Sequence, residues 1–419
     1  MRSPIRKLRL IFLSLISLAV AMSLFAENIG KNSVADIPPE RGLRTACLRM
    51  DVYPNSQIAS NTPGYAFSYF GDPNDYIYDG YLILGNSAAN LSYSTSLQGT
   101  GIPTPSNPFG YLHPDAIAMT IDSVSYASHR VAAGKGYNRD STIMFDVRWF
   151  AAKHPDTCNS MVAEFKIYKG PNGGTVTGLT IAYYVDVDVP ADSFSRNYCG
   201  VDPSRSMVYQ RGASTDGPNN NASRYAAMAG LSYRRQIIGG LVLPASTYIY
   251  PEAGVFENDS IWNRMSILQD GQYSIAPGFA DPGVGTGPAT DLVSVLVLDR
   301  NQTVTSSDTL YYGVVLAGQS DGGTLTGLKN AIDKGLYFAA DHNLVPGAFV
   351  EGCLCGDANN SGGFTISDVV YIITAVFAGG PLPSQPCLGD ANGSGDMSVS
   401  DAVFLIGFHF FGGPVPHCP

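Results

Sequence analysis

The sequence predicts a mainly β protein, with a large antiparallel β-sandwich body followed by a small all-α module. Three observations support this class. Short runs that alternate apolar and polar residues recur along most of the chain, and loops rich in glycine and proline separate them. The composition, with 46 Gly, 27 Pro and 24 Tyr but only 14% charged residues, is typical of a turn-rich extracellular β protein. The end of the chain instead holds an internal repeat with two apolar helical segments.

The first 26 residues predict a secretory signal peptide. An apolar stretch at 10–22 follows a basic start, and Ala26 offers a small residue for cleavage; the basic residues are Arg2, Arg6, Lys7 and Arg9. An uncleaved membrane anchor is the alternative, although the stretch is slightly short for a span. We therefore expect bacterial-type export, a secreted, extracellular or cell-surface location, and no membrane contact after signal removal.

The charge balance excludes some partners. The chain carries 25 Lys and Arg against 35 Asp and Glu, a formal charge of −10 at pH 7. Such an acidic chain argues against nucleic acid and anionic membrane surfaces as partners.

Residues 27–45 are predicted to be a polar leader, and 46–342 the β body, as one sandwich or two fused β modules. No regular helix is expected between strands, which argues against a parallel βαβ fold. The predicted strands lie within 78–85, 116–131, 142–152, 162–170, 178–189, 235–244, 291–299 and 309–318.

Two runs predict which side chains form the core. In 162–170, Ala163, Phe165 and Ile167 are expected to face inward, with Glu164 and Lys166 facing out. In 142–152 the inward residues are Ile143, Phe145, Val147 and Trp149.

One helix is predicted near the end of the body, at 324–340. Thr324 can cap its first turn, and the helix should cover one face of a sheet. Its apolar face comprises Leu325, Leu328, Ile332, Leu336 and Ala339. Residues 343–352 then form a linker, and 353–419 the terminal module.

The seven cysteines agree with export, because disulfides persist in oxidising compartments. Three lie in the body, so one of them is free or pairs across domains. Four lie in the terminal module, and their pairing is open. The positions are Cys47, Cys158, Cys199, Cys353, Cys355, Cys387 and Cys418.

The terminal module contains two copies of one motif. Residues 356–383 and 389–416 align without gaps at a period of 33 residues, and each copy opens with D-x-N-x-S-G and ends with an apolar helical segment. Alternate residues of a tightly turning loop can direct oxygen ligands at one centre, as Ca²⁺ requires. The predicted ligands of two calcium ions are Asp357, Asn359, Ser361, Gly363 and Asp368 in the first copy, and Asp390, Asn392, Ser394, Asp396 and Asp401 in the second.

An Asx-rich turn is the alternative for a single loop of this kind. Two copies in register, each running into an apolar helix, favour calcium. Only the first and twelfth positions of each loop are expected to supply side-chain carboxylates as ligands, so we expect modest affinity, towards roughly 10⁻⁴–10⁻³ M. Phe364 and Met397 are expected to pack the loops against a core.

The helices that follow the loops are apolar almost all round, and 353–419 contains no Lys or Arg. Either the two helices bury these residues against each other, or one face stays open for a partner. Calcium would stabilise a module whose core alone is marginal.

The terminal repeat resembles the type I dockerin family, with its paired EF-hand-like loops that lack the first helix. The resemblance covers 353–419 and implies two calcium loops, each followed by a helix. It also implies a cohesin-like scaffold protein as partner, usually in polysaccharide degradation. This sequence departs from the family where cohesin is contacted: the late loop positions hold Ile366-Ser367 and Val399-Ser400, and the helices carry Ile373-Thr374 and Ile406-Gly407 without a basic residue.

The body shows no catalytic motif. The strongest acidic pair is Asp186 and Asp188, weak candidates for catalysis at the end of one predicted strand. At i and i+2 their side chains project about 7 Å apart, within the roughly 5–9.5 Å of glycosidase carboxylates. A solvated edge or another cation site is the alternative. Four aromatic residues could stack on sugar rings or belong to the core: Trp149, Tyr183, Tyr184 and Trp262.

Three functions are therefore open. The first is a secreted calcium-binding protein that displays a binding body through a dockerin-like tail. The second is a hydrolase of O-glycosyl bonds in glycans with an unrecognised catalytic body. The third is a structural extracellular protein whose tail caps its own body.

Overall fold

We describe the fold from a computed structural model of the chain. The structure describes residues 42–58, 67–70, 72, 75–93, 113–114, 120–122, 124–189, 196–213, 223–234, 236–245, 258–281, 289–348, 354–361, 363–383, 386–394 and 396–417. The predicted signal peptide and the loop at 100–110 lie outside these ranges.

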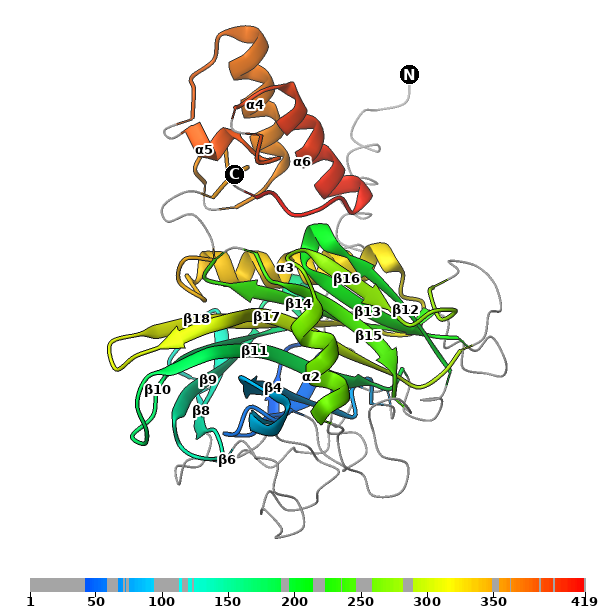
Figure 1. Ribbon diagram of the computed structural model, residues 1–419. Coiled ribbons are helices and arrows are strands. Elements are labelled where there is room, and N and C mark those ends of the chain that lie inside the picture. Colours follow the sequence, from blue (N-terminus) through cyan, green and yellow to red (C-terminus); the bar gives the residue numbers. More distant parts are fainter. Residues whose placement is uncertain are drawn as a thin grey trace, which may run out of the picture. The chain divides into compact units, whose positions relative to one another are not determined.

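The body is mainly β, as predicted (Figure 1). In the described residues, a nine-stranded sheet contains β12 (Asn197–Asp202), β13 (Met207–Gly212), β14 (Tyr225–Ser232), β18 (Thr309–Gln319), β10 (Ser160–Lys169), β9 (Ile143–Ala152), β8 (His129–Tyr137), β6 (His113–Pro114) and β7 (Thr120–Asp122). A six-stranded sheet contains β16 (Gln272–Ile275), β15 (Gly239–Pro244), β17 (Leu292–Val304), β11 (Val176–Val187), β4 (Asp79–Gly85) and β5 (Leu91–Ser92).

A small third sheet comes from the N-terminal part of the described chain. It joins β1 (Gly42–Arg44), β2 (Leu48–Asp51) and β3 (Ser68–Tyr69). The predicted leader therefore ends earlier than residue 45, because β1 pairs with β2 and Leu43 is fully buried. Short 3₁₀ turns are η1 (Ala88–Asn90), η3 (Pro155–Thr157) and η5 (Pro203–Arg205).

The two large sheets share one hydrophobic core. Trp149 on β9 and Phe165 on β10 meet Tyr183 on β11, with ring centroids 6.2 Å and 5.4 Å apart. The inward residues predicted for 142–152 and 162–170 are all fully buried. Two sheets that interleave side chains in this way have the layered core that a β-sandwich needs.

Glu164 corrects the predicted exposure of the outer face. It points away from the shared core, as expected, but is only 2% exposed. Its carboxylate pairs with Arg148, and its Oε1 accepts a hydrogen bond from the backbone N–H of Val345 at 2.9 Å. The chain that follows α3 thus covers this position, and a buried carboxylate is retained because it is paired.

Helix α3 (Leu325–Asp341) confirms the predicted helix. The Thr324 hydroxyl accepts a hydrogen bond from Gly327 N–H at 2.9 Å and caps the first turn. Leu328, Ile332 and Ala339 are buried against the outer face of the nine-stranded sheet. The helix therefore removes that face from solvent.

Helix α2 (Asn258–Ile267) was not predicted, and it corrects the expectation that no helix lies between strands. It connects β15 to β16, which pair in parallel. Ile261 and Met265 are fully buried on the outer face of the six-stranded sheet, with Trp262 packed beside them. The helix is short, so its i, i+4 apolar spacing is a weak signal among polar residues.

The disulfide pattern agrees with the cysteine count. Cys47 and Cys158 form a disulfide, and Cys199 is buried with a free thiol. In the tail, Cys355 and Cys387 are both disulfide-bonded. Of the helices in the described ranges, none is long and apolar enough to cross a membrane.

The segment 354–417, called the tail below, contains α4 (Ile366–Ala378), α5 (Pro386–Gly389) and α6 (Val399–Phe411). Helices α4 and α6 pack on each other through Val369, Ile372, Ala402 and Leu405, all nearly inaccessible. Both helices end at a glycine with positive φ, Gly379 at 67° and Gly412 at 65°. These left-handed caps require glycine and keep the two copies equivalent.

Candidate functional site

Each loop of the tail folds its first and last aspartate inward. In the first loop, Asp357 is 1% exposed and Asp368 is fully buried. Asp357 Oδ1 accepts a hydrogen bond from Ser361 N–H at 2.8 Å. Asp368 Oδ1 accepts from Asn359 N–H at 3.2 Å, and its Oδ2 accepts from Thr365 N–H at 2.8 Å. Asp368 thus closes the loop and begins α4 in a capping box with Thr365.

The second loop repeats this geometry almost bond for bond. Asp390 Oδ1 accepts from Ser394 N–H at 2.9 Å. Asp401 Oδ1 accepts from Asn392 N–H at 3.1 Å, and its Oδ2 accepts from Ser398 N–H at 2.8 Å. The same capping box begins α6. The two loops therefore share one fold, as their sequence predicts.

The other predicted ligands are close to these carboxylates. The hydroxyl of Ser361 donates to Asp357 Oδ1 and lies 3.4 Å from the Gly363 carbonyl oxygen. In the second loop Ser394 lies 3.2 Å from the Asp396 carbonyl oxygen in the same way. The Asp396 side chain is exposed, so its backbone oxygen is the ligand that the loop can offer.

Asn359 gives an independent sign that the first loop is built for a ligand. Its amide nitrogen donates to Ser367 Oγ at 2.9 Å, but its Oδ1 is buried and has no hydrogen-bond partner among the described residues. An unsatisfied buried oxygen costs free energy unless something fills its place. A hard cation accepts oxygen ligands of this kind, so the residues present fit calcium.

Phe364 and Met397, at equivalent loop positions, pack differently. Met397 lies against the tail's own core. Phe364 contacts Tyr337 of α3 and Phe408 of α6, with ring centroids 5.2 Å and 5.8 Å apart. The first loop therefore joins the tail core to the helix that covers the body.

A buried arginine of the body also holds the tail. Arg205 is 4% exposed and binds both carboxylate oxygens of Asp333 on α3 at 2.8 Å. It also donates to the backbone carbonyl oxygens of Gly412, at 3.0 Å, and Gly413. These carbonyls belong to the end of α6, where a cation is favoured.

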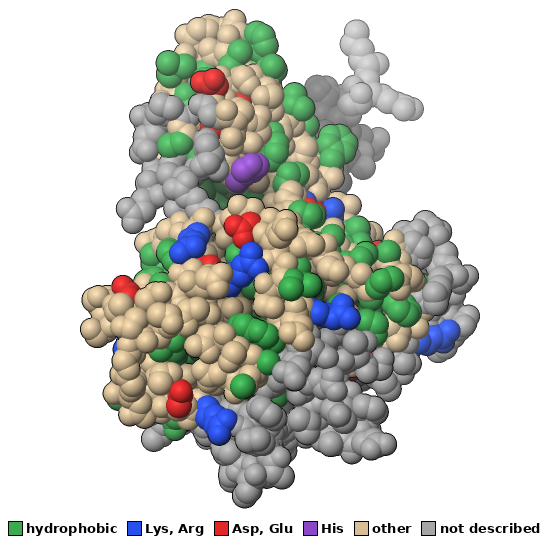
Figure 2. All heavy atoms as spheres, viewed as in Figure 1, with side chains coloured by type: hydrophobic (Ala, Val, Ile, Leu, Met, Phe, Trp, Pro, Cys, Tyr) green, Lys and Arg blue, Asp and Glu red, His purple; other side chains and the backbone are tan. Residues whose placement is uncertain are grey.

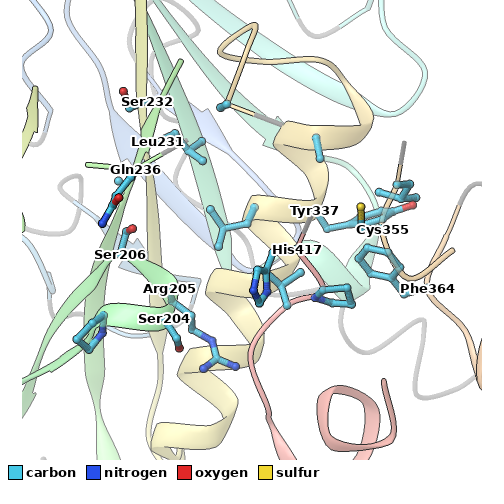
Figure 3. Close-up of a pocket in the computed structure, with 18 residues that line it drawn as sticks. Ser204, Arg205, Ser206, Leu231, Ser232, Gln236, Tyr337, Cys355, Phe364 and His417 are labelled. Atoms are coloured by element: carbon cyan, nitrogen blue, oxygen red, sulfur yellow. The ribbon is translucent and has the colours of Figure 1, made fainter. Parts of the chain in front are cut away.

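A cavity of about 450 Å³ lies beside this contact. Figure 3 shows Ser204, Arg205 and Ser206 on one side of it and Tyr337, Cys355 and Phe364 on the other. The charge of Arg205 is already matched by Asp333, so we assign no ligand to the cavity.

Asp186 and Asp188 lie at the end of β11, and the structure adds a third carboxylate, Asp291, directly before β17. One carboxylate oxygen of each lies within 4.8 Å of the others. Asp186 is 7% exposed and Asp188 is 9% exposed. Such burial leaves little access for a sugar ring. Asp291 lies at the start of a predicted strand, but the sequence around it does not indicate that it approaches Asp186 and Asp188.

The environment of these carboxylates opposes their charge. Burial, and then repulsion from Asp291 and Asp75, raises the pKa of Asp188 to about 7. Burial raises the pKa of Asp291 to about 6. Burial, and then repulsion from the neighbouring carboxylates, raises the pKa of Asp186 well above its usual value. The cluster is therefore costly when ionised and without a counter-charge.

The aromatic residues considered for sugar binding belong to the core. Trp149 and Tyr183 are fully buried and Tyr184 is 3% exposed, while Trp262, a residue of α2, is partly buried against the outer face of the six-stranded sheet. The sugar-platform hypothesis is therefore wrong for the three buried rings, since a stacking platform must be accessible.

No protein-family model matches the chain, and no curated protein matches it either. Among solved structures it is similar to a bacterial glucoamylase complexed with acarbose, at 10% identity and TM-score 0.36, covering 82% of this chain and 43% of that one. A galactosidase domain of an α-galactosidase–sucrose kinase gives 8% identity and TM-score 0.33, over 74% of this chain and 44% of that one. A putative aldose 1-epimerase from Escherichia coli K12 gives 8% identity and TM-score 0.31, over 67% and 98%.

The chain thus spans less than half the length of the first two proteins. All three TM-scores are low, so none of these likenesses assigns an activity to this chain.

Proposed function

We propose that this protein binds calcium through its two tail loops and attaches, through an apolar face of α4 and α6, to a scaffold protein outside the cell, where it displays its β body. The observation that carries the proposal is that α4 and α6 expose apolar residues at positions that the 33-residue repeat makes equivalent. The dockerin resemblance of the tail supports the same function.

The calcium part is supported by the charges buried in the tail. Asp357, Asp368, Asp390 and Asp401 are all 2% exposed or less, and the tail contains no Lys or Arg. Backbone N–H groups bind some of their oxygens but supply no full positive charge. A divalent cation in each loop would balance two of these carboxylates and use the serine, asparagine and backbone oxygens beside them.

Helices α4 and α6 expose apolar side chains at equivalent positions. Val370 and Val403, related by the 33-residue repeat, are 58% and 61% exposed, and Phe377 and Phe410, related in the same way, are 70% and 65% exposed. Figure 2 shows hydrophobic side chains among the surface atoms of the tail. Ile366, Ile373 and Val399 belong to the same face. Large exposed apolar side chains that recur at equivalent positions of both helices favour an interaction site.

The face carries no charge, so a partner would be bound by apolar burial and shape. This differs from the dockerin pattern, in which basic residues contribute. We therefore propose a partner that resembles a cohesin in its role: it is a scaffold protein that binds this face. A polysaccharide as the target of the body, or its hydrolysis by the body, follows only from the dockerin resemblance.

The alternative in which the tail caps its own body is favoured by two contacts, that of Arg205 with the end of α6 and that of Phe364 with Tyr337 of α3. The Arg205 contact uses backbone carbonyls at Gly412 and Gly413, whereas Val370 and Val403 remain exposed. The tail can therefore be held on the body and still present the apolar face.

The two functions are separated by calcium-dependent capture. The full chain would be immobilised and exposed to the organism's own secreted and envelope fraction, with calcium or with chelator. We expect a protein retained only with calcium, and lost when Val370 and Val403 are both replaced by Asp. Val124→Asp, at a body residue that is 87% exposed, is the matched control and should retain it. Equal retention by V370D/V403D, or no retention by a wild type shown to bind calcium, would reject attachment through this face.

A further inference from the structure

The end of the six-stranded sheet gathers carboxylates from separate parts of the chain. Asp186 is in β11, Asp188 directly follows β11, and Asp291 directly precedes β17, which pairs with β11. One carboxylate oxygen from each lies within 4.8 Å of the other two. Asp79 of β4 lies directly opposite Asp186 on the other side of β11. The strand pairing itself therefore forces these groups together.

Two of these carboxylates carry buried oxygen atoms with nothing to bind. Asp186 Oδ1 and Asp291 Oδ1 are inaccessible to solvent and have no hydrogen-bond partner among the described residues. Asp186 as a whole is 93% buried, and its carboxylate oxygen lies among those of the cluster. A charged oxygen left in this state costs several kilocalories per mole, so a native fold would be expected to supply a proton or a cation.

The charged groups near Asp186 and Asp188 increase the cost of ionising these two carboxylates. The groups that act on Asp186 are Asp188, Asp291 and Asp79, and those that act on Asp188 are Asp291 and Asp75. All of them are carboxylates. No described Lys, Arg or His is among the groups that act on Asp186 and Asp188.

We propose that Asp186, Asp188 and Asp291 bind a calcium ion in the body, separate from the two tail loops. Calcium binds oxygen ligands at about 2.3–2.6 Å, so two ligands of one ion can lie up to about 5 Å apart. The observed separations fit this limit. Magnesium demands near-ideal octahedral geometry and is usually bound by only one or two carboxylates, whereas three converge here. Zinc sites usually include nitrogen or sulfur, which the cluster lacks.

The position of this ion gives it a structural role. It would join the end of β11 to the start of β17 and relieve the repulsion from Asp79. Tyr81 and Tyr184 are stacked beside the cluster, with ring centroids 4.6 Å apart. Burial and these carboxylates hold the pKa of both phenols well above the usual value. The phenols therefore stay neutral and leave the negative charge to the aspartates.

The test counts calcium bound per full-length chain, after equilibrium dialysis and elemental analysis. The variant D186N/D291N keeps the shape of both side chains but removes two charges. D270N is the matched control, because the Asp270 side chain is 72% exposed. D357A/D390A removes the first ligand of both tail loops and leaves the body unchanged. We expect three ions for the wild type and D270N, two for D186N/D291N and one for D357A/D390A.

The tail variant keeps the proposal testable if D186N/D291N does not fold. One ion bound by folded D357A/D390A supports the body site. No ion bound by that variant means that the cluster shares protons instead, and it overturns the proposal. Equal counts for the wild type and folded D186N/D291N overturn it as well. Neither result depends on whether the apolar face of the tail binds a partner.

Discussion

Asp186 lies directly opposite Asp79 across the β11–β4 ladder, and both side chains are buried. Like charges in opposed positions destabilise a sheet. Asp188 and Asp291 increase the repulsion, because their carboxylates approach the same point. A divalent cation would reverse the sign of the interaction, so we expect this end of the sheet to depend on calcium.

The first prediction concerns stability with and without calcium. In chelator, D186N should melt at the same temperature as the wild type or higher, because it removes one repelling charge. With calcium at about 100 times its Kd, the wild type should gain about 2.7 kcal/mol from the body site, and D186N should lose most of that gain. Differential scanning calorimetry of full-length chains measures both. An equal gain in the two proteins would argue against the body site.

The second prediction separates the tail's core from its surface. Leu405→Ala, at a fully buried residue, should destabilise the tail by about 2–5 kcal/mol. Val403→Asp, at a side chain that is 61% exposed, should stay within about 0.5 kcal/mol of the wild type. Urea unfolding of the calcium-loaded chain, followed by helical circular dichroism, compares the two. Comparable losses would mean that Val403 is covered by protein in solution.

The third prediction tests the anchor between body and tail. Arg205→Ala leaves Asp333 buried without its guanidinium partner, which should cost about 3–5 kcal/mol. Arg205→Lys should recover only part of this, because Lys cannot match both oxygens of Asp333. The double variant R205A/D333A should be more stable than R205A, since the stranded Asp333 carboxylate is removed, while Asp202, which Arg205 also binds, keeps Lys329. Thermal unfolding of the three variants checks the order, and R205A/D333A no more stable than R205A would refute the buried pair.

The fourth prediction concerns the free thiol. Burial raises the pKa of Cys199 to about 12, so at pH 8 almost all of it is protonated and unreactive. The native, unreduced protein should therefore react with a thiol reagent slowly at pH 8, and the rate should rise as the pH approaches 12. In denaturant the same cysteine should react at once. Fast reaction of the native protein at pH 7 would show that Cys199 is accessible.

Much of the fold could be predicted because its signals are local. The runs at 142–152 and 162–170 alternate over their whole length, so β9 and β10 follow from the pattern. Thr324 and the apolar face behind it specify α3. The equivalence of the two tail copies also follows from the sequence, since the repeat places matching residues in matching hydrogen bonds.

The features that were not predicted depend on contacts between distant residues. Strand β14 contains Ala226, Ala227 and Ala229, which have weak strand propensity, and it forms because β13 and β18 flank it. The pattern predicts Glu164 at the surface, but Val345, which is distant in the sequence, covers it. Asp291 joins Asp186 only through the β11–β17 pairing. Local periodicity contains no information about any of these pairings.

We propose that calcium assembles the tail, and a calorimetric calcium titration of the full chain measures this. Helical circular dichroism would be recorded on the same samples. D357A/D390A should lose the two tail sites and the calcium-induced gain of helix, because each loop loses its first carboxylate. D396N should behave as the wild type, since only the backbone oxygen of Asp396 faces the loop. Unchanged calcium binding by D357A/D390A would show that calcium does not bind in the two tail loops.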